Sequence, residues 1–190
     1  MPITNVLLVG VGGQGILLAS EILAKVALEE GNDVKKSEVH GMAQRGGSVS
    51  SEVRFGDKIY SPLIRKGEAD FLLALEKLEA LRFLDYLKKE AVLIVNDLEI
   101  PPLMVSIGKQ QYPKDIFTHL KKRTSRIIKI RALKIAQTAG NSKTFNLVLL
   151  GKLSIFLKFK SSTWEKVIRQ EVPPHTIEVN LKAFELGKRS

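Results

Sequence analysis

The chain has 190 residues, of which 44% are apolar and 26% are charged, so one sizeable core is expected and general disorder is not. It holds no cysteine and only three widely spaced histidines, which argues against disulfides, iron–sulfur ligation and any metal site in this chain. No apolar run approaches the ~20 residues that span a bilayer, and residues 1–5 do not resemble the start of a signal peptide. We therefore expect a cytoplasmic protein with no membrane partner.

The net charge of +10 is concentrated in the second half of the chain. Residues 1–100 hold 12 basic and 15 acidic side chains, whereas residues 101–190 hold 18 basic and 5 acidic ones. A basic half attracts anionic partners at long range, such as an acidic protein, a phosphorylated cofactor or nucleic acid. A lysine-rich solvated surface explains the same distribution, so the charge alone does not choose between these alternatives.

The first 40 residues predict a strand, a glycine turn, a helix and a second strand. Residues 3–9 are apolar and β-branched, which is typical of a strand buried on both faces of a parallel sheet. Four glycines follow between Gly10 and Gly15, and residues 16–30 show helical periodicity. Residues 33–39 predict the second strand. This order is the opening of a doubly wound α/β fold.

The middle of the chain alternates strands and helices. A turn signal at Gly56-Asp57 suggests that the strand before it pairs back as a hairpin. The double proline at 101–102 breaks the chain before one more apolar stretch. The expected elements are strands at 48–55, 70–75 and 91–96, a hairpin partner at 58–60, a helix at 76–87 and a further strand at 103–107.

The remainder is expected to be mainly helical, apart from a short strand at 127–130. The expected helices lie at 113–123, 131–139, 144–159, 164–171 with Thr163 as N-cap, and 176–187. We therefore predict an α/β, Rossmann-like fold with a mostly parallel sheet flanked by helices and a helical C-terminal part. Residues 1–190 are expected to form a single domain, with the C-terminal helices, about 144–190, packed on it.

Residues 10–15 contain the spacing G-x-G-x-x-G. In this pattern the first glycine, Gly10, permits a tight turn, and the second, Gly12, lets the backbone approach a bound phosphate. The third, Gly15, allows helix and strand to pack closely. The following helix directs its free N–H groups at the same loop. A glycine turn kept only for packing remains the alternative.

A second glycine-rich loop spans residues 37–48 and gathers an imidazole, an amide and a guanidinium among small residues. Gln44 and Arg45 offer donors to a carboxylate or phosphate. Gly46 and Gly47 allow close approach of another backbone. His40 as a general base has no orienting acid in view except Glu38. An interaction loop without a ligand is the alternative interpretation.

Two other classes of protein also fit parts of the sequence. A standalone NAD-binding Rossmann protein would use Glu38, at the end of the second predicted strand, for the ribose. No convincing catalytic set accompanies it. The basic second half admits a nucleic-acid-binding protein, but aromatic residues make up only 6% of the chain and no known nucleic-acid-binding signature is present, so no nucleic-acid partner is expected.

The two glycine motifs together resemble the gamma-type domain of 2-oxoacid:ferredoxin oxidoreductases. They read Gly10-Val-Gly-Gly-Gln-Gly15 and Glu38-Val-His-Gly-Met-Ala-Gln-Arg-Gly-Gly47, and the second, with Ser37 before it, is similar to the indolepyruvate type of that family. The resemblance covers roughly residues 4–155, whereas residues 160–190 carry no recognised motif. Further matching stretches lie at 60–64, 67–70, 74–76, 79–82, 139–141 and 146–151.

The resemblance implies a small subunit that works beside a large alpha subunit. In such a complex an aryl 2-oxoacid is decarboxylated on thiamine diphosphate, the acyl group leaves as a coenzyme A thioester, and electrons pass through iron–sulfur clusters to ferredoxin. The thiamine diphosphate and the clusters are expected in the alpha subunit, and no cofactor is expected on this chain alone. The lack of cysteine agrees with that division.

No catalytic residue is assigned to this chain, which is expected to be inactive when isolated. The glycine turns and their polar neighbours are instead expected to face coenzyme A or the active-site cleft. The candidate cofactor-binding residues are Gly10, Gly12, Gly13, Gln14, Gly15, His40, Gln44, Arg45, Gly46 and Gly47.

Overall fold

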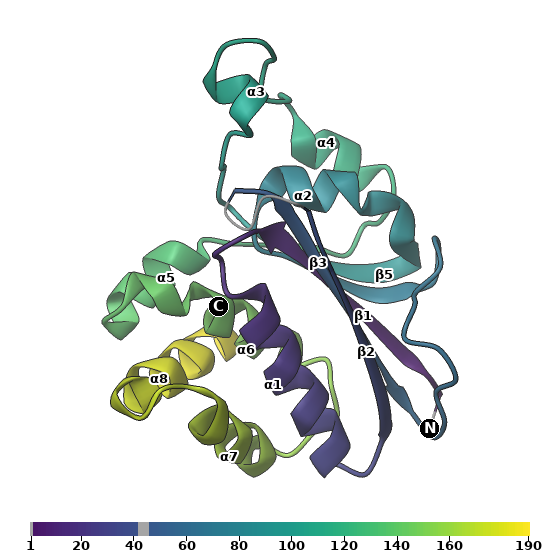
Figure 1. Cartoon of the computed structure of the whole chain (residues 1–190), viewed down its shortest axis with the longest axis vertical. Coiled ribbons are helices and arrows are strands. Elements are labelled where there is room, and N and C mark those ends of the chain that lie inside the picture. Colours follow the sequence, from purple (N-terminus) through teal and green to yellow (C-terminus); the bar gives the residue numbers. More distant parts are fainter. Residues whose placement is uncertain (1, 42–45) are drawn as a thin grey trace.

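The computed structural model describes residues 2–41 and 46–190, and in that part of the chain six strands form one mixed sheet with helices on both faces (Figure 1). The strand order is β2-β3-β1-β4-β5-β6. β1, β4, β5 and β6 pair in parallel, whereas β3 runs antiparallel to both of its neighbours. All the strands except β3 therefore run in one direction, which confirms the predicted α/β, mostly parallel fold.

The six strands lie close to the ranges predicted from the sequence. We call the side of the sheet where β1, β2, β4, β5 and β6 end the carboxyl edge, and the side where they begin the amino edge. Because β3 is reversed, it begins at the carboxyl edge. The strands are β1 (Thr4–Val11), β2 (Asp33–His40), β3 (Ser48–Gly56), β4 (Ala69–Ala74), β5 (Leu87–Asn96) and β6 (Ile127–Ile130).

The helices fall into two groups on the two faces of the sheet (Figure 1). The first face is covered by α1 (Ile16–Glu29), α5 (Ala132–Ala139), α6 (Phe145–Ser154), α7 (Ser161–Glu171) and α8 (Ile177–Lys188). The second face carries α2 (Lys77–Arg82) and α4 (Ile116–Lys121), with α3 (Leu103–Ser106) beyond them. Single 3₁₀ turns are η1 (Leu84–Tyr86), η2 (Ser142–Thr144) and η3 (Pro174–Thr176).

Two apolar cores lie on the two faces of the sheet. In β1, Val6 and Leu8 belong to the core shared with α1 and the C-terminal helices, whereas Leu7 and Val9 belong to the core under α2 and α4. All four side chains are fully buried. A strand covered on both sides reads as a continuous apolar run, which is why it was recognisable in the sequence. The first core also joins the sheet to the C-terminal helices. The single-domain organisation stays a prediction.

Helices α6 and α8 approach each other unusually closely. A Cβ added at Gly151 would lie 2.1 Å from the Phe184 carbonyl oxygen, and one at Gly187 would lie 2.0 Å from the Val148 carbonyl oxygen. No real side chain fits at such distances. The two glycines therefore let the backbones of these helices touch directly.

Two expected strands are not formed. Residues 58–60 have no strand conformation, because the Ile59 side chain is buried and its N–H donates to the Asp33 carboxylate at 2.7 Å instead of to a strand. The stretch 103–107 was predicted as a strand but begins with helix α3. Pro102 stands at its N-cap, where the missing proline N–H is not needed, and its carbonyl accepts from Val105 and Ser106.

Several helix ends also differ from the sequence prediction. The helix expected at 76–87 ends at Arg82 and is followed by η1, and the one expected at 144–159 ends at Ser154. Thr163 is not an N-cap, because α7 already begins at Ser161 and the Thr163 hydroxyl donates to the Glu30 carboxylate. In the described part of the chain no helix is long and apolar enough to cross a membrane.

Candidate functional site

The first glycine motif forms the turn from β1 into α1. Gly13 and Gly15 have φ angles of 99° and 78°, in the left-handed region that favours glycine. Gly15 is the N-cap of α1, where no side chain caps the helix and no acidic residue lies in the first turn. The first N–H groups of α1 have no acceptors within the helix, so this end of α1 offers backbone donors to an anion.

Gly10 has a different role from the one its place in the motif suggested. It lies within β1 rather than in the turn, and a Cβ there would stand 2.5 Å from Gln14 Oε1 and 3.0 Å from the Leu75 Cβ. The missing side chain makes room for Gln14, whose amide accepts from the Val11 N–H at 2.7 Å and donates to the Leu75 carbonyl at 3.3 Å. Gln14 is buried and ties the ends of β1 and β4 together.

Gly15 packs against a helix rather than against the strand. The Asn146 side-chain amide, on α6, donates to the Gly15 carbonyl at 3.1 Å, and a Cβ at position 15 would stand 2.5 Å from that same nitrogen. The sequence predicted that Gly15 lets a helix pack on a strand, and this was wrong, because the element that packs against Gly15 is helix α6. Asn146 is almost fully buried and fixes the start of α1 on the C-terminal helices.

The two glycine motifs lie against each other at the carboxyl edge. The Gly12 N–H donates to the Gly47 carbonyl at 2.8 Å, and the Gly46 N–H points at the Gly12 carbonyl at 3.5 Å. These contacts continue the pairing of β1 with β3, whose last pair is Val11 with Ser48. We call this arrangement the joined turns. Residues 42–45, and with them the predicted ligand donors Gln44 and Arg45, lie outside the described residues.

A cavity of about 520 Å³ lies beside the joined turns. Its volume is in the range of small-molecule sites. The lining combines exposed backbone of the first turn with apolar side chains from α1 and β3. The lining residues are Gly12, Gly13, Gly15, Ile16, Leu17, His40 and Val49. Of the ten predicted site residues, four therefore face one cavity.

His40 and Glu38 do not form a catalytic pair in the described structure. The Glu38 carboxylate bonds to Lys36 at 3.0 Å, and His40 Nδ1 lies 3.5 Å from the Gly41 carbonyl. The reversed strand β3 also separates β2 from β1. Glu38 is therefore displaced by two strand spacings, roughly 10 Å, from the strand that leads into the first turn. The ribose contact of a dinucleotide fold needs these strands to be neighbours.

A buried carboxyl lies behind the second loop. Glu79 on α2 accepts hydrogen bonds from the Ser48 hydroxyl and from Arg82, the latter at 2.7 Å, and its side chain is only 3% exposed. Burial raises the pKa of this carboxyl, and the neighbouring Glu76 raises it further, against the opposite effect of Ser48 and Arg82. Glu79 therefore fixes the start of β3, where the second loop ends.

Sequence reasoning named neither this carboxyl nor the buried amide of Asn96 as a site residue. Asn96 donates to the Leu75 carbonyl and accepts from the Ala132 N–H, both at 3.1 Å. The Leu75 carbonyl thus accepts hydrogen bonds from both Gln14 and Asn96, and these bonds link the ends of β1, β4 and β5. A polar residue that ends an otherwise apolar strand was the available signal, because a buried amide needs partners.

The described residues contain no group of three or more histidine, aspartate or glutamate side chains that would hold a metal ion. Together with the absence of cysteine from the sequence, this leaves no ligand set for an iron–sulfur cluster in the described part of the chain.

The fold and the paired glycine motifs are those of a known family. Residues 5–190 match the model of the pyruvate ferredoxin/flavodoxin oxidoreductase family. The crystal structure of the keto/oxoacid ferredoxin oxidoreductase gamma subunit of Geobacter sulfurreducens is similar, with a TM-score of 0.72, 26% identity and coverage of 98% of this chain and 96% of that chain. This chain belongs to that oxidoreductase family.

Within the family, the chain is similar to subunits of the indolepyruvate type. It is 44% identical to the indolepyruvate oxidoreductase subunit IorB of Thermococcus kodakarensis, over 98% of this chain and 95% of that protein. It is 42% identical to the subunit of the same name from Pyrococcus horikoshii, with the same coverage. The similarity extends over residues 160–190, where the sequence alone offered no motif.

Proposed function

We propose that this chain is the small subunit of an indolepyruvate-type 2-oxoacid:ferredoxin oxidoreductase in the cytoplasm. The complex would convert an aryl 2-oxoacid such as indolepyruvate, with coenzyme A, into an acyl-CoA and carbon dioxide, and pass two electrons to ferredoxin. The observation that carries this proposal is the 44% identity to an indolepyruvate oxidoreductase subunit over nearly the full length of both chains.

The redox cofactors of such a reaction would belong to a larger catalytic subunit. Iron–sulfur clusters need cysteine ligands, and this sequence has none. The residues of this chain therefore do not fit a cluster, and we derive no electron-transfer step within it. What the chain contributes is a surface beside which the reaction is completed.

That surface is proposed to be the joined turns and the cavity next to them. The Gly12 and Gln14 N–H groups are already bonded within the joined turns. The uncapped start of α1 still offers N–H groups and a positive dipole end, a combination that suits a phosphate. The anionic phosphates of coenzyme A are the co-substrate groups that match this chemistry. Arg45, which belongs to the same loop in the sequence, is proposed to add a guanidinium to the phosphate site.

The proposal is tested by expressing the chain with and without the large catalytic subunit of the same organism. We expect each subunit alone to be inactive and the purified complex to reduce ferredoxin in the presence of coenzyme A, with indolepyruvate preferred over pyruvate and 2-oxoglutarate. Turnover by the isolated chain, or a complex that ignores aryl 2-oxoacids, would contradict the proposal.

The same complex tests the coenzyme A site. Arg45→Ala is expected to raise the KM for coenzyme A about tenfold or more, because a charge-assisted hydrogen bond to phosphate is lost, while the KM for indolepyruvate stays the same. Arg169→Ala, at an exposed position of α7, removes the same charge far from the joined turns and serves as the control. Equal effects of the two substitutions would remove Arg45 from the site.

A further inference from the structure

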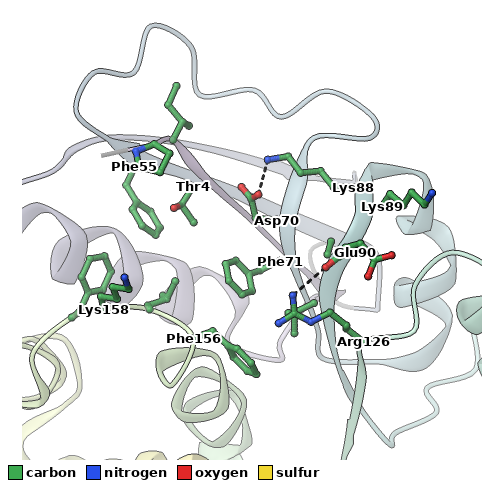
Figure 2. Close-up of a pocket in the computed structure, with 16 residues that line it drawn as sticks. Thr4, Phe55, Asp70, Phe71, Lys88, Lys89, Glu90, Arg126, Phe156 and Lys158 are labelled. Atoms are coloured by element: carbon green, nitrogen blue, oxygen red, sulfur yellow. Dashed lines mark hydrogen bonds and ion pairs between the residues drawn. The ribbon is translucent and has the colours of Figure 1, made fainter.

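A second cavity, of about 610 Å³, lies at the amino edge of the sheet, opposite the joined turns. It is formed where β1, β4 and β5 begin, where the reversed strand β3 ends, and where the chain leaves α6 (Figure 2). We call it the amino-edge pocket. None of the glycine-motif residues lines it, so the function proposed above leaves it unexplained.

Four phenylalanines belong to the apolar lining of the amino-edge pocket. The rings of Phe71 and Phe156 have centroids 6.1 Å apart, and those of Phe55 and Phe159 are 5.4 Å apart, both in tilted arrangements. Such distances between ring centroids are typical of favourable aromatic contacts, and the aromatic ring of a ligand could make the same kind of contact with these side chains. Figure 2 shows the Phe156 ring below the Phe71 ring, with Lys88 and Glu90 of β5 to their right.

Positive charge surrounds these rings. The pocket is lined by four cationic side chains but only two carboxylates, at Asp70 and Glu90. One carboxylate is already neutralised, because Lys88 bonds to Asp70 at 2.5 Å. Lys89 and Lys158 are exposed and make no ion pair within the described residues. Arg126 is also exposed and donates to the Glu90 backbone carbonyl at 3.3 Å. Lys89, Lys158 and Arg126 are therefore available to an anionic ligand.

The backbone of β5 is distorted beside the pocket, at the segment that carries Lys88 and Lys89. In the pairing of β4 with β5, Ala69 stands opposite Leu87 but Phe71 stands opposite Val92, so residues 88–91 bulge out of the ladder. Glu90 within this bulge has a φ of 70°, a left-handed conformation that is strained for glutamate. Bulges and retained strain of this kind are concentrated at binding sites.

We propose that the amino-edge pocket binds a small aromatic carboxylate. The ring of the ligand packs against Phe71 and Phe156, and its carboxylate is attracted by the cations around the pocket, among them Lys89 and Lys158, which lie on opposite sides of it in Figure 2. The rings supply the apolar contact and the two free lysines select an anion over a neutral compound of the same shape. The inference does not rest on the proposed function, because the pocket is at the other edge of the sheet and its test needs no turnover.

The test is calorimetric titration of the full chain with 2-naphthoate and, in parallel, with neutral 2-naphthamide. We expect saturable binding of the carboxylate and binding of the amide that is at least fivefold weaker, as expected when about 1 kcal/mol of charge interaction is lost. The double variant Lys89→Glu/Lys158→Glu is expected to bind 2-naphthoate at least about tenfold more weakly. Both positions are exposed, so the fold is expected to tolerate the change.

A matched control changes the same number of charges elsewhere. Lys134→Glu/Lys182→Glu lies on α5 and α8, at exposed positions outside the pocket, and is expected to bind 2-naphthoate like the parent chain. Equal loss in both double variants, equal affinity for the acid and the amide, or no saturable binding at all would overturn the proposal. Binding that disappears when the catalytic subunit is added would also overturn it, since the pocket would then be part of a subunit interface.

Discussion

The carboxyl edge and the amino edge of the same sheet are built for recognition in different ways. At the carboxyl edge the joined turns present backbone, and the left-handed positions Gly13, Gly15 and Gly46 are all glycines. At the amino edge the pocket presents rings and cations, and its left-handed position is Glu90. At the carboxyl edge glycine adopts the left-handed conformation without strain, whereas at the amino edge Glu90 adopts it with strain.

This difference decides what the sequence reveals about each edge. Recognition by backbone needs glycine at fixed spacings, so it leaves a motif that is visible in one sequence. Recognition by side chains draws single residues from separate elements and leaves no local pattern. Here these are Phe55, Phe71 and Lys89 from three strands and Lys158 from the segment after α6. The amino-edge pocket becomes visible only after the strands are paired.

The largest expected effect comes from filling the carboxyl edge. Gly15→Ala places a Cβ 2.5 Å from the Asn146 amide and forces alanine into a left-handed φ, so we expect a loss of about 2–4 kcal/mol in the free energy of unfolding. The matched control is Gly31→Ala, because Gly31 has a similar φ of 84° but nothing within 4 Å of the added Cβ.

Urea unfolding of both glycine variants measures the contribution of packing. Gly31→Ala is expected to lose only about 1 kcal/mol, from backbone strain alone. If the two variants lose the same free energy of unfolding, close packing of the joined turns on α6 contributes nothing to stability. The proposed difference between the two edges would then be contradicted.

A smaller, pH-dependent effect is expected at Glu79, also at the carboxyl edge. Burial raises the pKa of this carboxyl in the folded chain, so the folded chain holds the proton more tightly than the unfolded one. The free energy of unfolding must then fall as pH rises above the ordinary value of 4.5 and through the raised pKa. Glu79→Gln removes this fall, so the stability of the variant relative to the parent is expected to rise with pH.

Urea unfolding at several pH values between acid and neutral measures this trend. The exposed Glu185 on α8 provides the control, since Glu185→Gln makes the same charge change at the surface. A Glu79→Gln variant whose relative stability does not change with pH would show that the carboxyl behind the second loop is solvated.

The smallest effect, with the opposite sign, is expected at the amino edge. Glu90→Gly relieves the left-handed strain at that position and is expected to raise the free energy of unfolding by about 0.5 kcal/mol. Lys89→Gly, at the neighbouring position of the same bulge, relieves no strain and is expected to lower it by about 0.5–1 kcal/mol. Thermal unfolding of the two variants decides whether the amino edge is strained.

The sequence predicted the sheet well, since periodicity depends on burial, and each central strand is buried on both faces. It failed where a tertiary contact decided the local structure. Ile59 was expected in a hairpin, but its N–H is bound by Asp33, which lies 26 residues earlier. Helix α6 ends at Ser154 although the apolar run of the sequence continues, because Phe156 and Phe159 pack against phenylalanines of the strands.

For the carboxyl edge, the sequence predicted that two glycine motifs meet, and the Gly12–Gly47 hydrogen bond confirms that they do. It did not predict the individual roles of the glycines. Gly10 makes room for Gln14, and Gly15 makes room for Asn146, because the space a glycine leaves is filled by residues that only the fold brings near. The ligand assigned to the joined turns stays a prediction.

The reversed strand β3 also has a consequence for how the family can diversify. Both ends of the connection from β2 to β3 are fixed, one by the pairing of His40 with Val49 and the other by the bond between Gly12 and Gly47. Because both flanking ends are fixed, we expect changes of sequence between them to leave the sheet intact. Exchange of residues 42–45 between relatives is therefore expected to leave the stability of the sheet unchanged, and the proposed role of Arg45 predicts that the affinity for coenzyme A changes.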